Sequence, residues 1–207
     1  MWDLYKKHPG WVLGFHGCDE SIGEQVLSGK VAHLAPSKNE YDWLGEGIYF
    51  WENNPARALE FARDGAGSDP KVTKGKIANP FVIGAIIDLG LCFNLLDSSA
   101  LAELAEAHKT LETLYKSASL SMPVNKGKDR RVRFLDRAVI EAVHDYRALP
   151  DLDGNPVLPR YDSVRAGFWE GDELFVGAGF AEKSHIQIAV CNTDCIKGYF
   201  RPIRSPM

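Results

Sequence analysis

The sequence predicts an α+β fold, in which strands toward both ends of the chain enclose a helical middle. Short apolar runs at residues 12–16 and 186–190 have the length and composition of strands. Between them, apolar residues recur at helical spacing over residues 100–117 and again over residues 132–146. This grouping of strands and helices favours the α+β class.

Capping residues and glycines indicate the elements that follow the first strand. Residues 21–27 are expected to form a helix, because Ser21 is a good N-cap, Glu24 completes a capping box and Gly29 can end the helix. Residues 35–47 are polar and contain glycines, so we expect a loop there.

A short aromatic strand and a second helix are predicted after this loop. Residues 48–51, Ile-Tyr-Phe-Trp, have the aromatic composition of a strand. Asn53 or Asn54 is expected to cap a helix that has Pro55 in its first turn and ends near residue 63.

The remaining elements are predicted from composition and hydrophobic period. We expect an exposed loop at 64–74, a buried strand at 80–89, a polar linker at 121–130 between the two middle helices, and a strand at 163–170. The middle helices and their linker are expected to form a helical insertion at about 98–147 within a single domain spanning residues 1–207.

Charge and cysteine content limit the classes of function. The net charge of −4 argues against a generally basic nucleic-acid-binding protein. Cys18, Cys92, Cys191 and Cys195 have no zinc-site spacing, so we expect reduced thiols and no metal. Neither a signal peptide nor a membrane-spanning run is evident, so we expect a cytoplasmic protein without membrane contact; a toxin exported by other machinery would have the same features.

Two glycine-flanked motifs carry the strongest functional signal. The first is Gly14-Phe15-His16-Gly17-Cys18, and the second is Gly45-Glu46-Gly47-Ile48-Tyr49-Phe50, with Tyr49 placed 33 positions after His16. A His and a Tyr at two strand ends beside glycines can frame a narrow slot for a flat ring. Taken alone, His16 fits a strand-end residue that caps a backbone group, and Tyr49 fits a core aromatic.

In order, spacing and glycine context, these motifs resemble the ADP-ribosyltransferases of the diphtheria-toxin and poly-ADP-ribose polymerase type. The resemblance covers residues 12–62 well and 180–202 fairly. It implies two packed, mainly antiparallel sheets that form an NAD cleft with flanking helices. It also implies that NAD is bound as a substrate.

The resemblance assigns roles to four residues of the N-terminal third. Gly17 would present its backbone to the nicotinamide carboxamide, and a side chain there would block close approach. His16 would hydrogen-bond a ribose hydroxyl, and Tyr49 would stack on the nicotinamide ring. Phe61 would be the second stacking aromatic, whereas Ala58 stands where the family often has a serine.

The third catalytic position departs from the family pattern. Gln187 lies in Ser184-His185-Ile186-Gln187-Ile188, where the resemblance calls for a glutamate. A glutamine can donate and accept hydrogen bonds, but it has no negative charge and cannot act as a general base. Glu170, Glu173 and Glu182 precede this strand, and either one of them supplies the missing charge or all three are solvated surface acids.

Together these features predict a mono-ADP-ribosyltransferase that uses NAD and has His16, Tyr49 and Gln187 at its catalytic centre. The acceptor would be a macromolecule, either a protein or a nucleic acid. The resemblance extends to bacterial toxins and defence effectors, for which an antitoxin or immunity protein would be a partner. An NAD glycohydrolase and a non-catalytic NAD-binding module are the alternatives.

Two basic features have both functional and structural interpretations. Arg165 either pairs with the NAD pyrophosphate or is a surface arginine. The basic run from Lys126 to Arg133 either contacts nucleic-acid phosphates or forms a solvated helix start.

Overall fold

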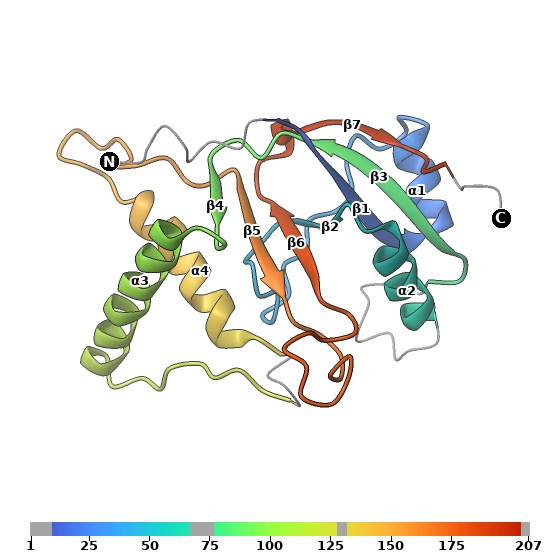
Figure 1. The fold of residues 1–207 in the computed structure, drawn as a ribbon. Coiled ribbons are helices and arrows are strands. Elements are labelled where there is room, and N and C mark those ends of the chain that lie inside the picture. Colours follow the sequence, from blue (N-terminus) through green and yellow to red (C-terminus); the bar gives the residue numbers. More distant parts are fainter. Residues whose placement is uncertain (1–9, 67–76, 128–131, 204–207) are drawn as a thin grey trace.

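The computed structural model describes residues 10–66, 77–127 and 132–203. In these residues a seven-stranded sheet carries helices on both faces (Figure 1). The strands are β1 (Val12–Asp19), β2 (Ile48–Glu52), β3 (Pro80–Ile87), β4 (Cys92–Asn94), β5 (Ser163–Phe168), β6 (His185–Val190) and β7 (Ile196–Phe200). The α-helices are α1 (Glu20–Leu27), α2 (Pro55–Ala66), α3 (Ser98–Ser117) and α4 (Phe134–Arg147).

The strands follow the order β4-β5-β6-β2-β1-β3-β7 across the sheet. All neighbours pair antiparallel except β4 and β5, which are parallel. The predicted α+β class is confirmed. The two packed sheets implied by the family resemblance are replaced by one mixed sheet, because β2 pairs with both β1 and β6 and joins the two halves.

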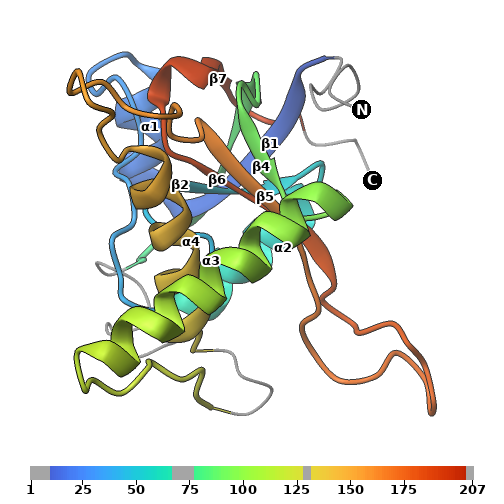
Figure 2. The ribbon, with the colours of Figure 1, turned by 90° about the vertical axis from the view of Figure 1, so that its left-hand side faces the viewer.

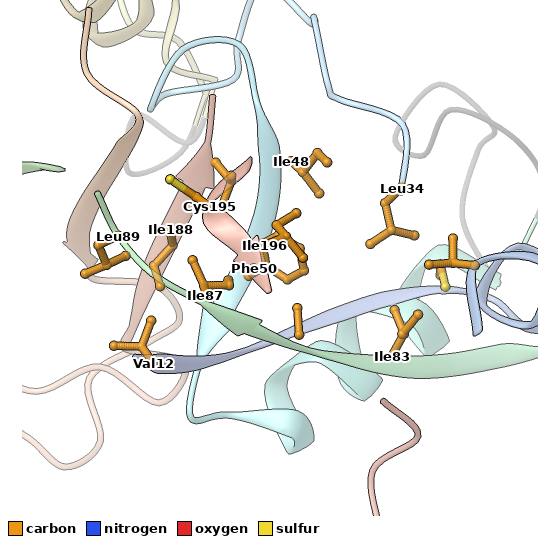
Figure 3. Close-up of a cluster of buried hydrophobic side chains, with 14 of the residues drawn as sticks. Val12, Leu34, Ile48, Phe50, Ile83, Ile87, Leu89, Ile188, Cys195 and Ile196 are labelled. Carbon is orange, nitrogen blue, oxygen red and sulfur yellow. The ribbon is translucent and has the colours of Figure 1, made fainter. Parts of the chain in front are cut away.

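One face of the sheet is closed by α1 and a large aliphatic cluster. Val26 of α1 packs in this cluster with side chains from several strands. Figure 3 shows Phe50, Ile83 and Ile188, from three different strands, among its members. These three side chains are completely buried.

The other face is covered by two separate groups of helices. Helix α2 packs Ala58 and Phe61 on Phe15 of β1 and Trp51 of β2. Helices α3 and α4 pack on β4 and β5 through a different cluster of buried residues. The two helical covers lie toward opposite ends of the sheet, as Figure 1 shows. Strands β6 and β2 lie between them in the strand order, so their side chains on this face occupy the seam between the covers.

The helices confirm the predicted periods, but the cap of the first helix differs from the predicted one. Asp19 caps α1 by accepting a hydrogen bond from the Ser21 amide at 3.0 Å, and Asp97 caps α3 through the Ser99 amide at 2.6 Å. At α1 the Asp19 side chain replaces the expected Ser21 cap, because its carboxylate reaches the free N–H group of Ser21. Asn54 accepts from the Arg57 amide at 3.0 Å, as the sequence predicted for the start of α2.

Two further boundaries differ from expectation. Helix α2 continues to Ala66, so the predicted loop at 64–74 begins inside the helix, and its remainder from residue 67 lies outside the described residues. Strand β4, three residues long, was not predicted. No helix in the described part of the chain has both the length and the apolar character needed to cross a membrane.

Candidate functional site

His16, Tyr49 and Gln187 lie on three neighbouring strands in the middle of the sheet, β1, β2 and β6. Strand β2 pairs with β6 from Ile48 to Trp51, but its register with β1 includes only two residue pairs, ending at Phe15–Trp51. His16 is the first residue of β1 beyond that point. His16 and Tyr49 therefore lie where the ladder between β1 and β2 stops. The side chain of His16 points to the face of the sheet that carries Phe50, because its neighbours Phe15 and Gly17 face α2. The side chains of Tyr49 and Gln187 point to the face of the helical covers.

The imidazole of His16 bridges the two strands at this point. Its Nδ1 lies 2.7 Å from the Tyr49 carbonyl oxygen, and its ring meets Phe50 edge-on with centroids 6.0 Å apart. A carbonyl oxygen can only accept, so Nδ1 carries the proton and donates it. Burial lowers the pKa of His16, so the ring is neutral near pH 7 and its Nε2 presents a lone pair.

Gly17 is a glycine because helix α2 packs directly against it. A Cβ atom built at Gly17 would lie 2.1 Å from the carbonyl oxygen of Ala58 and 3.3 Å from Cβ of Ala62. Backbone atoms cannot yield at this distance, so no larger residue fits. The close approach is made by the helix, which supplies a structural reason for glycine besides the ligand contact expected from the sequence.

The two predicted stacking aromatics lie in different clusters. The Tyr49 hydroxyl donates to the Gly45 carbonyl at 2.8 Å and accepts from the Leu44 amide at 3.1 Å, so it fixes the turn that precedes β2. Burial raises the pKa of Tyr49 well above its usual value. The Phe61 ring packs on Trp51, with centroids 5.0 Å apart, in the cluster under α2.

Gln187 faces the seam between the helical covers. Its Cα lies opposite Trp51 on one side and Ala166 on the other, which places the three side chains on one face of the sheet. The Oε1 atom of Gln187 accepts a hydrogen bond of 2.5 Å from Nε1 of Trp43, a residue of the loop before β2. This hydrogen bond orients the side-chain amide of Gln187.

His185 lies two residues before Gln187 and points to the same side of β6. Its Nδ1 lies 2.7 Å from the Lys183 carbonyl oxygen, and burial lowers its pKa. The ring is therefore neutral near pH 7, with the proton on Nδ1 and a lone pair on Nε2. That Nε2 atom is buried and has no hydrogen-bond partner among the described residues.

Arg57, in the first turn of α2, brings a buried cation to the seam. It is 7% exposed, its Nη2 donates to Oε2 of Glu170 at 2.7 Å, and its guanidinium carbon lies 5.8 Å from the Trp51 ring centroid. Oε2 of Glu170 is also 4.0 Å from Nδ1 of His185. Arg57 Nε and Nη1 and Trp51 Nε1 are buried without hydrogen-bond partners in the described part of the chain.

These side chains form a single constellation, which we call the β6–β2 seam: Trp43, Trp51, Arg57, Phe168, Glu170, His185 and Gln187. Of the three candidate carboxylates, Glu170 is partly buried in the seam, whereas Glu173 and Glu182 are exposed.

Arg165 is a largely buried residue outside the seam, so the reading of it as a surface arginine is wrong, and its pairing with Glu52 argues against the other reading, a ligand for pyrophosphate. It faces the other side of the sheet, because Ala166 is the residue of β5 that shares a face with Gln187. There its Nε and Nη2 donate to the Glu52 carboxylate at 2.5 and 2.8 Å. Both side chains are about nine-tenths buried, so this guanidinium is committed to Glu52.

The sequence contained partial signals for the seam residues that were missed. His185 and Gln187 share the two-residue period of a strand, and Arg57 and Phe61 share the four-residue spacing of a helix face. Trp43 lies in an irregular loop, where no period indicates its contact with Gln187.

Comparisons with protein-family models, curated proteins and solved structures found no match to this chain. Within the described residues, no group of three or more His, Cys, Asp or Glu side chains is placed to hold a metal ion. What the site can do must therefore be argued from its own residues.

Proposed function

We propose that this protein is an NAD-dependent mono-ADP-ribosyltransferase. The observation that supports the proposal is the placement of His16, Tyr49 and Gln187 on the three adjacent strands β1, β2 and β6, near the point where β1 and β2 stop pairing. His16 contributes a neutral imidazole whose Nε2 lone pair can accept a hydrogen bond from a ribose hydroxyl.

The reaction breaks the bond between nicotinamide and C1′ of the ribose. The bonding electrons leave with nicotinamide, positive charge develops on the sugar, and a nucleophile of the acceptor forms the new bond to C1′. Gln187 can position a ribose hydroxyl or the acceptor through its amide. Glu170 is the carboxylate of the seam, but Arg57 pairs with it at 2.7 Å, so it can offset the positive charge of the sugar only in part.

A proton must also leave the acceptor as the new bond forms. His185 is the residue of the seam suited to take it, since Nε2 carries a free lone pair and Glu170 lies 4.0 Å from Nδ1 to stabilise the imidazolium. Nε2 is buried in this structure, so an acceptor reaches it only if the side chains packed around His185 move.

The loop between β5 and β6, residues 169–184, favours a protein as the acceptor. It extends away from the body of the molecule, as Figure 2 shows, and precedes the strand of Gln187. It has five largely exposed apolar side chains and four acidic residues against one lysine: Trp169, Leu174, Phe175, Val176 and Phe180; Glu170, Asp172, Glu173 and Glu182; Lys183. Exposed apolar groups of this kind suit a protein surface, and the acidic charge would repel nucleic-acid phosphates.

The same loop argues for transfer to a macromolecule over hydrolysis, because water needs no docking surface. The alternative of a non-catalytic NAD-binding module is favoured by Gln187, whose oxygen is held by Trp43 and whose side chain is uncharged. Activity measurements separate the three possibilities.

Release of nicotinamide from NAD is the decisive measurement. We expect release by the wild-type protein, a loss on the order of a hundredfold in His16→Ala, and an increase of about tenfold in Gln187→Glu, which restores charge next to the sugar. His33→Ala is the matched control, since His33 is also partly buried but contacts Tyr199 on β7. Full activity of His16→Ala would show that the site is wrong.

Mass spectrometry of the products identifies the kind of reaction. ADP-ribose attached to a protein supports transfer, whereas free ADP-ribose without a labelled macromolecule supports hydrolysis. Measurable NAD binding with no nicotinamide release would indicate the non-catalytic module.

A further inference from the structure

The loop 169–184 is an ordered element, because its two arms pair with each other. The Lys183 amide donates to the Glu170 carbonyl at 2.8 Å near the base, and the Leu174 amide donates to the Phe180 carbonyl at 3.0 Å near the tip. These bonds hold the arms side by side along the loop, which extends away from the body of the molecule in Figure 2. The side chains at its tip are therefore presented in a fixed arrangement.

Two ion pairs hold the base of the loop on helix α2. Nη2 of Arg57 donates to Oε2 of Glu170 at 2.7 Å, and Nζ of Lys183 lies 3.5 Å from Oδ2 of Asp64. Arg57 and Asp64 both belong to α2, whereas Glu170 and Lys183 lie on opposite arms of the loop. Since both arms are attached, the loop has a set direction before any partner binds, which lowers the entropy that binding costs.

The tip of the loop exposes a cluster of apolar side chains. Four of them are 59–101% exposed: Leu174, Phe175, Val176 and Phe180. Leu174 and Phe180 lie opposite each other on the two arms, and Phe175 and Val176 follow directly, so the four gather at one place. Apolar clusters left exposed in this way are typical of surfaces that bind another protein.

The charge around this cluster is negative. The loop has four acidic residues and a single lysine, Lys183, which is paired with Asp64. Glu173 and Glu182 are exposed, so their charge faces solvent and attracts a partner with basic side chains. The same charge repels nucleic-acid phosphates and anionic lipid headgroups, and it disfavours a second copy of this chain, whose net charge is −4.

We propose that the loop 169–184 is a docking arm for a protein partner with a basic surface. An apolar pocket of the partner receives the tip, and Lys and Arg side chains around that pocket pair with Glu173 and Glu182. This binding does not depend on the transfer of ADP-ribose. The proposal therefore stands or fails separately from the proposed function, which nicotinamide release tests.

Random peptides displayed on phage are the probe for this surface, selected on the immobilised wild-type protein. We expect the selected peptides to combine aromatic or aliphatic residues with Lys and Arg. A synthetic peptide of the consensus sequence, labelled with a fluorophore, should then bind the wild-type protein saturably in fluorescence anisotropy.

A substitution at the tip tests the apolar contact. Val176→Ser should weaken binding of the consensus peptide about tenfold, because the buried apolar area is lost. Leu152→Ser is the matched control and should leave the affinity unchanged, since Leu152 lies on a different loop and is as exposed as Val176. Both side chains are fully exposed in the free protein, so neither replacement should unfold it.

A charge reversal tests the basic character of the partner. Glu182→Lys should weaken the peptide about fivefold at low salt, and the effect should shrink at high salt because exposed charges are screened. Glu40→Lys changes the net charge by the same amount at an exposed position outside the loop and should have little effect.

Each outcome bears on the proposal. Failure to enrich basic peptides, or equal affinity of the consensus peptide for wild type and Val176→Ser, would overturn the docking arm, and equal effects of Glu182→Lys and Glu40→Lys would overturn the basic partner. A dimer in sedimentation velocity that Val176→Ser dissociates would identify a second copy as the occupant instead. Binding to vesicles of phosphatidylcholine and phosphatidylserine that Val176→Ser abolishes would identify a membrane, and either result would overturn the proposal.

Discussion

The two ends of the sheet are covered in different ways on the same face. Under α2, Gly17, Ala58 and Ala62 allow the helix backbone to approach β1 so closely that a Cβ at Gly17 would meet Ala58 oxygen at 2.1 Å. Under α3 and α4, the small residues Ala166 and Gly167 of β5 instead line a cavity of about 680 Å³.

The difference shows that small residues bring a helix close to a strand only when both the helix and the strand carry them. Ala58 and Ala62 on α2 face Gly17 on β1, and the gap closes. At the other end the helices present leucines, and α3 buries only Ala100 and Ala107 fully, so the bulk of these side chains holds the helices away from the sheet. One end is consequently closely packed, and the other keeps a cavity of about 680 Å³.

The largest effect is expected at Gly17, where α2 and β1 are most closely packed. Gly17→Ala should reduce the free energy of unfolding by about 3 kcal/mol, because the new methyl group meets backbone atoms that cannot move independently of α2. Urea unfolding followed by circular dichroism measures the change. Gly198→Ala on β7 is the control, since a Cβ there meets nothing within 4 Å.

This substitution also separates the two explanations for glycine at position 17. If Gly17→Ala keeps wild-type stability but loses NAD binding, the residue is required by the ligand and the packing argument fails. If stability falls as expected, the helix alone is enough to explain the glycine.

Much of the fold could be predicted because local patterns determine it. The helices at residues 98–117 and 134–147 follow from the spacing of their apolar residues, and β6 follows from its apolar run. The joining of all strands into one sheet was missed, because it depends on the pairing of β2 with β6, residues 48–51 against 187–190, which no local signal encodes.

The candidate site could be predicted from the sequence only in part, for the same reason. The motifs around His16 and Tyr49 are local, and the structure places them on adjacent strands. The partners of Gln187 come from distant segments, such as Trp43, 144 positions earlier. Side chains that meet only through tertiary packing leave no periodic pattern in the sequence. The roles of the candidate site residues in NAD chemistry stay predictions.

The α3 and α4 end should be one acid-sensitive part of the molecule, besides His16 and His185, whose pKa values burial also lowers. His144 of α4 is 3% exposed, and burial, aided by Arg160, lowers its pKa to about 4 from the usual 6.5. His144 therefore binds a proton more readily in the unfolded chain than in the folded protein. The free energy of unfolding is at its full value above pH 6.5 and falls as the pH drops toward 4. The expected loss between pH 7 and pH 5 is about 2 kcal/mol.

Replacement of the titrating group tests this assignment. His144→Phe should reduce the difference in unfolding free energy between pH 7 and pH 5, whatever its effect at pH 7 alone. His108→Phe on α3 is the control and should leave the difference near its wild-type value. An unchanged pH dependence in His144→Phe would mean that another group causes the acid sensitivity.

The smallest effect concerns Trp43, which links the two ends of the covered face. Its Nε1 donates to Oε1 of Gln187 at 2.5 Å, and its ring lines the cavity. A double-mutant cycle with Trp43→Phe and Gln187→Met should give a coupling free energy of about 1 kcal/mol, the net value of one partly buried hydrogen bond. Chemical unfolding of the four proteins supplies it.

A second cycle, pairing Trp43→Phe with Tyr199→Phe on β7, should be additive because the two side chains lie toward opposite edges of the sheet. Additivity in the first cycle as well would mean that Trp43 does not hold Gln187 in solution. The end of the sheet under α2 and the end under α3 and α4 would then act independently. Coupling confined to the first cycle would instead show that Trp43 orients the Gln187 side chain through this hydrogen bond.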